Sequence, residues 1–218
     1  MLAYVFWHRP RDPAATESYE QAQIAFHNSL SRSRPIGMCG SASFRVAEIP
    51  WLAAETSGAH VGATGGQGAS GYEDWYLLED YTALGVLNEA AVGHGHRTLH
   101  DEAARRFGAG AGALYGLIEG ERVHGAKDTG LLGDASLAVW VSRPVGSTRR
   151  ALDELLGDGM DPRHASLWRR QLVFGPAPEF CLLSRERPGL ELSSGVAATR
   201  LPEGWSAQIL DREVLCNG

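Results

Sequence analysis

The sequence predicts an α+β protein, and three observations lead to that prediction. Short segments rich in aromatic and β-branched residues, typical of strands, alternate along the 218-residue chain with longer segments whose apolar residues recur at helical spacing. The segment 138–142 repeats the character of 2–8, and an Arg-Pro pair follows each of them. The segment 179–183 repeats 74–78 in the same way. The two halves of the chain are therefore predicted to share one order of elements.

The first half is predicted to fold in the order strand, helix, strand, strand, helix, strand. Asp12 is positioned as the N-cap of the first helix, with Pro13 at its first position. Asp80 is positioned as the N-cap of a later helix. The expected strands are 2–8, 41–46, 73–79 and 113–119, the expected helices are 14–31, the one after Asp80 and 97–107, and glycine-rich connectors are expected at 55–71 and 108–112.

The second half is predicted to repeat this order with its second helix reduced or absent. A polar linker at 120–135 separates it from the first half, which divides one compact unit into parts 1–120 and 135–218. The expected strands of the second half are 138–142, 167–174, 179–183 and 205–211, and its expected helix is 147–157.

Strand-helix-strand-strand-helix-strand is the order of the ferredoxin-like motif. Two such units in one chain resemble the dimeric α+β barrel superfamily, which includes antibiotic-biosynthesis monooxygenases, muconolactone isomerases, chlorite dismutases, and EthD-like and NIPSNAP-like proteins. The resemblance implies two antiparallel sheets packed face to face. It implies no particular activity, because one fold serves many chemistries.

Charge and cysteine usage limit the classes of partner and the compartment. The net charge of −6 argues against nucleic acid or an anionic membrane as a partner, since both require a basic face. The sequence has no apolar run long enough for a membrane-spanning helix. The chain has an odd number of cysteines, and they are far apart in the sequence: Cys39, Cys181 and Cys216. This usage favours reduced thiols over disulfides. We therefore expect a cytoplasmic protein.

Alternation along the strands predicts an aromatic chamber between the two sheets. Neighbouring strand residues point to opposite faces. If the valines at 5 and 139 pack under helices, their aromatic neighbours point between the sheets. Ligand sites are usually apolar with a few convergent polar groups, so a small molecule is the expected occupant. The residues expected to line this chamber are Tyr4, Phe6, His8, Arg45, Trp75, Glu79, Trp140, Ser142 and Arg170.

Two functions are compatible with such a chamber. The first is small-molecule binding or homo-oligomerisation without catalysis. The second is a cofactor-independent oxygenase or isomerase that acts on a small anionic or aromatic substrate. In that enzyme His8 would be the general base, and Arg45 or Arg170 would hold an anionic oxygen. No cofactor is expected, and His27 on the first helix is expected to be structural.

A third function, metal-dependent catalysis, rests on a histidine cluster. His96 and His100 are four residues apart and would share one helix face, and His94 is close in sequence. Metalloprotease helices carry Glu after the first histidine, whereas Arg97 stands there in this chain. Because the spacing also fixes no third ligand, we expect no bound metal.

Overall fold

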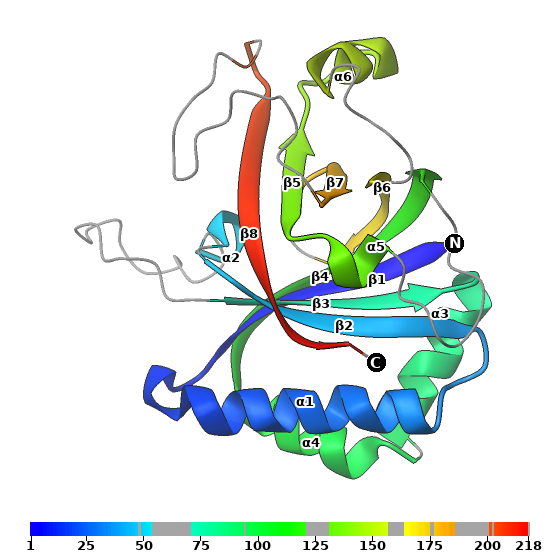
Figure 1. Cartoon of the computed structure of the whole chain (residues 1–218), viewed down its shortest axis with the longest axis vertical. Coiled ribbons are helices and arrows are strands. Elements are labelled where there is room, and N and C mark those ends of the chain that lie inside the picture. Colours follow the sequence, from blue (N-terminus) through cyan, green and yellow to red (C-terminus); the bar gives the residue numbers. More distant parts are fainter. Residues whose placement is uncertain are drawn as a thin grey trace.

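Eight strands form one closed antiparallel barrel in the computed structural model of the chain (Figure 1). The structure describes residues 1–47, 49–53, 71–93, 95–120, 131–156, 164–174, 177–185, 201 and 203–217. The strands are β1 (Leu2–Pro10), β2 (Met38–Val46), β3 (Gly71–Leu78), β4 (Phe107–Glu119), β5 (Leu137–Ser142), β6 (Ala165–Phe174), β7 (Phe180–Ser184) and β8 (Ser206–Asn217). Around the barrel they follow the order β1, β3, β2, β8, β5, β7, β6, β4.

The longer helices of the first half cover the outer face of the barrel on one side. The helices are α1 (Thr16–Arg32), α2 (Pro50–Ala53), α3 (Tyr81–Asn88), α4 (Arg97–Arg106), α5 (Leu131–Asp134) and α6 (Arg149–Leu156), with a 3-10 turn at Pro13–Ala15 and a π-helical turn at Glu89–Gly93. Figure 1 shows α1 and α4 side by side beneath the strands of the first half, with α3 at their end. No helix within the described ranges is long and apolar enough to cross a membrane.

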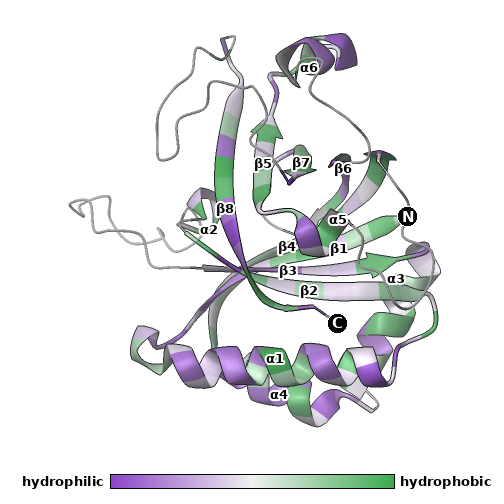
Figure 2. Cartoon of the chain, in the orientation of Figure 1, coloured by the Kyte–Doolittle hydropathy of each residue, from purple (hydrophilic) through white to green (hydrophobic). Residues whose placement is uncertain are grey.

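The caps and most elements predicted from the sequence are confirmed. The Asp12 carboxylate accepts a hydrogen bond from the Ala14 amide at 2.9 Å, and Asp80 accepts one from the Ala83 amide at 3.0 Å. Along α1, apolar and hydrophilic residues alternate at helical spacing (Figure 2). The side chains that this helix buries against the sheet include those of Tyr19, Gln23, Phe26, His27 and Leu30.

The predicted connector at 108–112 is instead the first half of β4, and its glycines explain the difference. A Cβ at Gly110 would lie 2.8 Å from the Phe6 ring, and one at Gly112 would lie 2.8 Å from the Tyr4 hydroxyl. Both glycines therefore leave space for aromatic side chains of the paired strand β1. The predicted connector at 55–71, apart from Gly71, and most of the linker at 120–135 lie outside the described residues.

The prediction of two ferredoxin-like units with face-to-face sheets is wrong, and with it the tandem repeat and the resemblance to the dimeric α+β barrel superfamily. Residues 206–211 of β8 pair with β5, and residues 212–217 pair with β2. β4 likewise pairs with both β1 and β6. These long strands join what would have been free sheet edges, so one barrel interior replaces a space between two sheets.

The strand faces of β1 are also opposite to those predicted. Ala3, Val5 and Trp7 point into the barrel and belong to its apolar core, together with Trp75, Trp140 and Trp168. The Trp7 and Trp140 rings meet edge to face with centroids 5.0 Å apart. An eight-stranded barrel has only enough interior volume for its own side chains, so small residues such as Ala3 must accompany these indoles. The aromatic neighbours on β1 consequently lie outside, under the helices.

Candidate functional site

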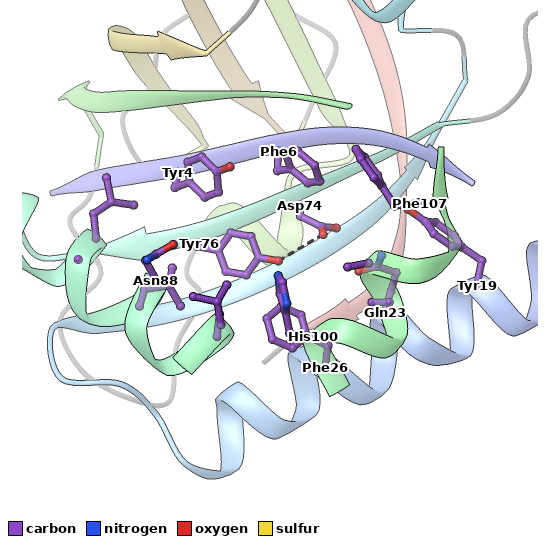
Figure 3. Close-up of a pocket in the computed structure, with 17 residues that line it drawn as sticks. Tyr4, Phe6, Tyr19, Gln23, Phe26, Asp74, Tyr76, Asn88, His100 and Phe107 are labelled. Atoms are coloured by element: carbon purple, nitrogen blue, oxygen red, sulfur yellow. Dashed lines mark hydrogen bonds between the residues drawn. The ribbon is translucent and has the colours of Figure 1, made fainter. Parts of the chain in front are cut away.

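A cavity of about 710 Å³ lies between the outer face of β1 and β3 and helices α1, α3 and α4 (Figure 3). Its lining is mostly apolar, and its polar side chains gather toward the end that holds Asp74, Gln23 and Tyr19, except for Asn88 at the opposite end (Figure 3). The aromatic lining residues are Tyr4, Phe6, Tyr19, Phe26, Tyr76 and Phe107. The other polar lining residues are Gln23, Asp74, Asn88 and His100.

Asp74 is the charged group at the centre of this polar end. Its side chain is on β3 and the residue is only 2% exposed. The Oδ2 atom lies 3.0 Å from His8 Nε2 and 3.4 Å from His27 Nε2, and it accepts a hydrogen bond from the Tyr76 hydroxyl at 3.3 Å. The Oδ1 atom has no hydrogen-bond partner within the described part of the chain. One carboxylate is therefore shared by two imidazoles and still has an unused acceptor.

The electrostatics of the site favour an ionised carboxylate beside neutral phenols. Burial alone would raise the pKa of Asp74, but the imidazoles of His8 and then His27 beside the carboxylate hold that pKa well below its usual range. Burial, and then the negative charge of Asp74, raise the pKa of Tyr19 and of Tyr76 above the ordinary value. Both tyrosines therefore keep their hydroxyl protons.

Stacked rings hold the two imidazoles in place. His8 is stacked against Tyr72, with centroids 5.5 Å apart and an interplanar angle of 12°. Its Nδ1 atom is hydrogen-bonded to the Tyr19 hydroxyl at 2.5 Å. His27 is stacked on Tyr76 in the same manner, and its Nδ1 atom is hydrogen-bonded to Ser41 Oγ at 2.9 Å. Both imidazoles are fully buried, so neither can turn without disturbing its neighbours.

A second buried carboxylate, Glu73, points the other way into the barrel. It accepts hydrogen bonds from the indole nitrogens of Trp7, Trp75 and Trp140 at 3.0, 2.7 and 3.1 Å. Its Oε1 atom also lies 3.2 Å from Nε of the fully buried Arg212. Arg212 in turn lies 3.4 Å over the centre of the Phe44 ring. This cluster fills the barrel core and shares no lining residue with the cavity.

The residues predicted to line a chamber between sheets do not lie together in the structure. Tyr4 and Phe6 line the cavity, and His8 lies behind its wall. Trp75 and Trp140 pack together in the barrel interior with centroids 6.0 Å apart. The remaining predicted residues lie away from the cavity: Arg45 pairs with Glu20 and Glu213, Glu79 is exposed beyond the end of β3, Ser142 is half-buried at the end of β5, and Arg170 donates to the Ala177 carbonyl.

The histidines considered as metal ligands have separate roles where the structure describes them. His96 is hydrogen-bonded through Nδ1 to Ser29 Oγ at 2.9 Å and through Nε2 to the Ser33 carbonyl at 3.0 Å. Both its nitrogens thus fasten the start of α4 to the end of α1. His100 lines the cavity beside Phe26, and His94 lies outside the described residues. In the described ranges no group of three or more His, Cys, Asp or Glu side chains could hold a metal ion.

Sequence reasoning missed Asp74, Tyr19 and Tyr76 as site residues and treated His27 only as structural. One signal was present in the sequence. Glu73 and Asp74 interrupt an otherwise aromatic and aliphatic strand, and carboxylates in such a strand are almost never buried unless they are paired. Tyr19, Gln23 and His27 also recur every four residues on one face of α1. Together these patterns indicate polar groups beneath the first helix.

Comparison with known proteins shows only distant structural likeness. No family model and no curated protein matches the chain. Among solved structures, that of an anthrone oxidase-like protein aligns with a TM-score of 0.48 and 12% sequence identity, covering 100% of this chain and 92% of the other. A likeness at that level carries no argument about the activity of this chain.

Proposed function

We propose that this chain binds a small aromatic molecule carrying at least one hydroxyl group, in the cavity between the barrel wall and α1, α3 and α4. The observation that carries the proposal is a buried, ionised carboxylate in the wall of a largely apolar cavity, that of Asp74. Small-molecule sites are concave, mostly apolar and about 300 to 1,000 Å³ in volume, with a few polar groups that orient the ligand. The cavity volume of about 710 Å³ is within that range.

The polar end of the cavity favours a ligand that donates hydrogen bonds. Asp74 Oδ1 is a buried acceptor without a partner among the described residues. Leaving such an acceptor unsatisfied costs about 1–3 kcal/mol, and more when the group is charged. The phenolic oxygens of Tyr19 and Tyr76 are further acceptors at the same end. A hydroxyl group on the ligand can donate to one of these three oxygens, while its rings occupy the aromatic part.

The charge around the cavity favours a ligand that enters neutral. None of the described lining residues is Lys or Arg. Arg45, which the sequence suggested as an anion-binding residue, is paired with Glu20 at 2.9 Å and with Glu213 at 2.5 Å. An anionic ligand would therefore approach the ionised Asp74 without an arginine or lysine to compensate its charge, which is unfavourable in a buried site.

Calorimetric titration with two matched compounds tests the proposal. The probes are 4-nitro-1-naphthol and 1-nitronaphthalene, which differ by one hydroxyl group, at a pH where free naphthol is neutral. A hydrogen bond to a charged group contributes about 1.5–3 kcal/mol, so the naphthol is expected to bind at least about tenfold more tightly. If neither compound binds the folded protein, or if both bind with equal affinity, the proposal is wrong.

The observations favour ligand binding over the other functions that the sequence left open. The indoles that an oligomeric interface would use are packed inside the barrel. A metal-dependent activity has no ligand cluster to support it in the described part of the chain. A cofactor-independent oxygenase or isomerase would need the same cavity, so it stays compatible with the proposed binding. The expected cytoplasmic location and the expected absence of a cofactor stay predictions.

A further inference from the structure

The geometry around His8 suggests more than binding. We infer that Tyr19, His8 and Asp74 form a proton relay that ionises the hydroxyl group of a phenol or enol held in the cavity. This inference rests on the proposed function and adds an activity to it, namely general acid–base catalysis on a ligand oxygen. Tyr19 would touch the ligand, whereas His8 and Asp74 act through Tyr19.

Three features place these residues in one continuous chain. Tyr19 lines the cavity, and its hydroxyl is 2.5 Å from His8 Nδ1. The opposite nitrogen of the same ring, Nε2, is 3.0 Å from Asp74 Oδ2. The His8 Nε2 atom does not meet the angular criteria for a hydrogen bond to Asp74. The buried imidazole and carboxylate are nevertheless close enough for a strong electrostatic interaction. In this arrangement the imidazole is the base for the phenol, and the carboxylate orients the imidazole.

The relay moves two protons and needs no other reactant. In its resting form Tyr19 donates to the bare Nδ1 of His8, and the Tyr19 oxygen accepts a hydrogen bond from the ligand hydroxyl. The ligand O–H bond then breaks and its proton joins the Tyr19 oxygen, while the Tyr19 proton joins His8 Nδ1. The products are a ligand oxyanion, a neutral Tyr19 that now donates to it, and an imidazolium beside Asp74. The total charge of the site is unchanged.

Three titratable side chains pack directly against His8. The titratable groups that face it are Tyr19 from α1 and Tyr72 and Asp74 from β3. Asp74 is the one ionised group among these three, and its carboxylate lies 3.0 Å from the ring that would receive the proton. His27 of α1 shares Asp74 Oδ2 and competes for the same negative charge. The Glu20–Arg45 pair reaches Tyr72 through a 2.8 Å hydrogen bond from the Tyr72 hydroxyl and is internally neutralised.

The second imidazole is less well placed for the same task. The Tyr76 hydroxyl is 3.4 Å from His27 Nε2, and that same nitrogen is the one that faces Asp74. A proton from Tyr76 would therefore arrive at the same nitrogen that faces the carboxylate. His27 thus does not connect Tyr76 and Asp74 through its two different nitrogens, as His8 connects Tyr19 and Asp74. The short Tyr19–His8 hydrogen bond, on the nitrogen opposite Asp74, makes Tyr19 the residue that passes the proton.

The ionisation state of bound 4-nitro-1-naphthol tests the relay, because the neutral and ionised probe absorb at different wavelengths. The spectrum is recorded during titration with protein, one pH unit below the pKa of the free probe, so affinity and ionisation come from one experiment. We expect the bound probe to be mostly ionised, which corresponds to at least about a tenfold shift of its ionisation equilibrium. Tyr19→Phe and His8→Gln should bind the probe in its neutral form.

Matched variants and distinct outcomes keep the relay separate from binding. Tyr115→Phe is the control, since it removes another buried hydroxyl, one that donates to the Pro178 carbonyl away from the cavity, and it should behave as wild type. Each variant is compared only after circular dichroism confirms a wild-type fold. If His8→Gln does not fold, the test relies on Tyr19→Phe alone. A wild-type complex with a neutral probe, or an ionised probe in either variant, would overturn the relay and leave the proposed binding intact. A probe that does not bind wild type would contradict both.

Discussion

Glu73 and Asp74 are consecutive residues of β3 whose carboxylates lie on opposite sides of the barrel wall. Both residues are at most 2% exposed. Glu73 is bound by three indoles and lies beside Arg212 in the barrel core, whereas Asp74 faces two imidazoles at the end of the cavity. One residue therefore organises the interior of the fold and its neighbour organises the candidate site. Changes at the two positions should be separable in experiment.

Replacing Asp74 with Asn is expected to remove the preference of the cavity for a hydroxylated ligand. The substitution keeps the size of the side chain but removes the charge that orients His8 and His27. Affinity for 4-nitro-1-naphthol should fall by about tenfold or more, towards that for 1-nitronaphthalene, because a hydrogen bond to a charged group contributes about 1.5–3 kcal/mol. Glu73→Gln, compared under conditions where circular dichroism shows a wild-type fold, is the matched control, since it neutralises the adjacent carboxylate on the other face. Equal losses in the two variants would contradict this assignment.

Asp74 should also determine part of the acid sensitivity of the fold. Its pKa is well below the ordinary value in the folded protein, whereas an unfolded Asp has a pKa of about 3.9. As pH falls below that value, the unfolded chain binds a proton that the folded protein does not, so stability is lost. Above about pH 5 the contribution is fully present. Urea unfolding is measured from pH 6 to pH 3 on wild type and Asp74→Asn. The free energy of unfolding should fall less steeply with decreasing pH in the variant. Parallel curves would contradict the prediction.

The buried pair in the barrel core should show strong coupling. Removing one partner of a buried ion pair leaves an uncompensated charge, which costs about 3–5 kcal/mol. Glu73→Gln or Arg212→Met alone is expected to lower the free energy of unfolding by about that amount. The double variant should lose clearly less than the sum of the two, because no unpaired charge remains. Additive losses, measured by urea denaturation, would show that the two side chains act independently.

Two glycine substitutions test the packing around the cavity. Gly110→Ala places a methyl group 2.6 Å from the Phe107 ring and 2.8 Å from the Phe6 ring, so the fold should be destabilised by about 1–3 kcal/mol. Gly85→Ala is the comparison, because no atom other than those of its chain neighbours and its own helix backbone lies within 4 Å of the new Cβ on α3. That variant should gain up to about 1 kcal/mol from helix propensity. Melting temperatures that move in the same direction for both variants would contradict the described packing.

The elements of this fold could be predicted from the sequence, because their signals are local. Asp80 caps α3 as expected, and Asp12 caps the 3-10 turn that leads into α1. Most strands lie in the alternating or aromatic segments that predicted them. Closure of the barrel could not be predicted, since it depends on pairing β8 with both β2 and β5. No local pattern specifies a partner so distant in sequence. A single strand pattern also cannot say which of its two faces is inside, which is why β1 was assigned the wrong way round.

The candidate site was predicted only in fragments for the same reason. Tyr4 and Phe6 were expected beside a ligand, and His8 was expected to exchange protons. Its partners come from α1 and β3, and a histidine is assigned a role by what its two nitrogens contact. Tyr19 is eleven residues from His8 and Asp74 is sixty-six residues away, so only the folded chain brings them together.

The most direct test of this account is a crystal structure of the protein with 4-nitro-1-naphthol. The account predicts that the rings lie between the β1 aromatics and the α1–α4 side of the cavity. It also predicts that the naphthol oxygen is within hydrogen-bond distance of the Tyr19 hydroxyl or of Asp74 Oδ1. A compound that lay outside this cavity, or whose oxygen pointed away from both Tyr19 and Asp74, would contradict the proposed binding.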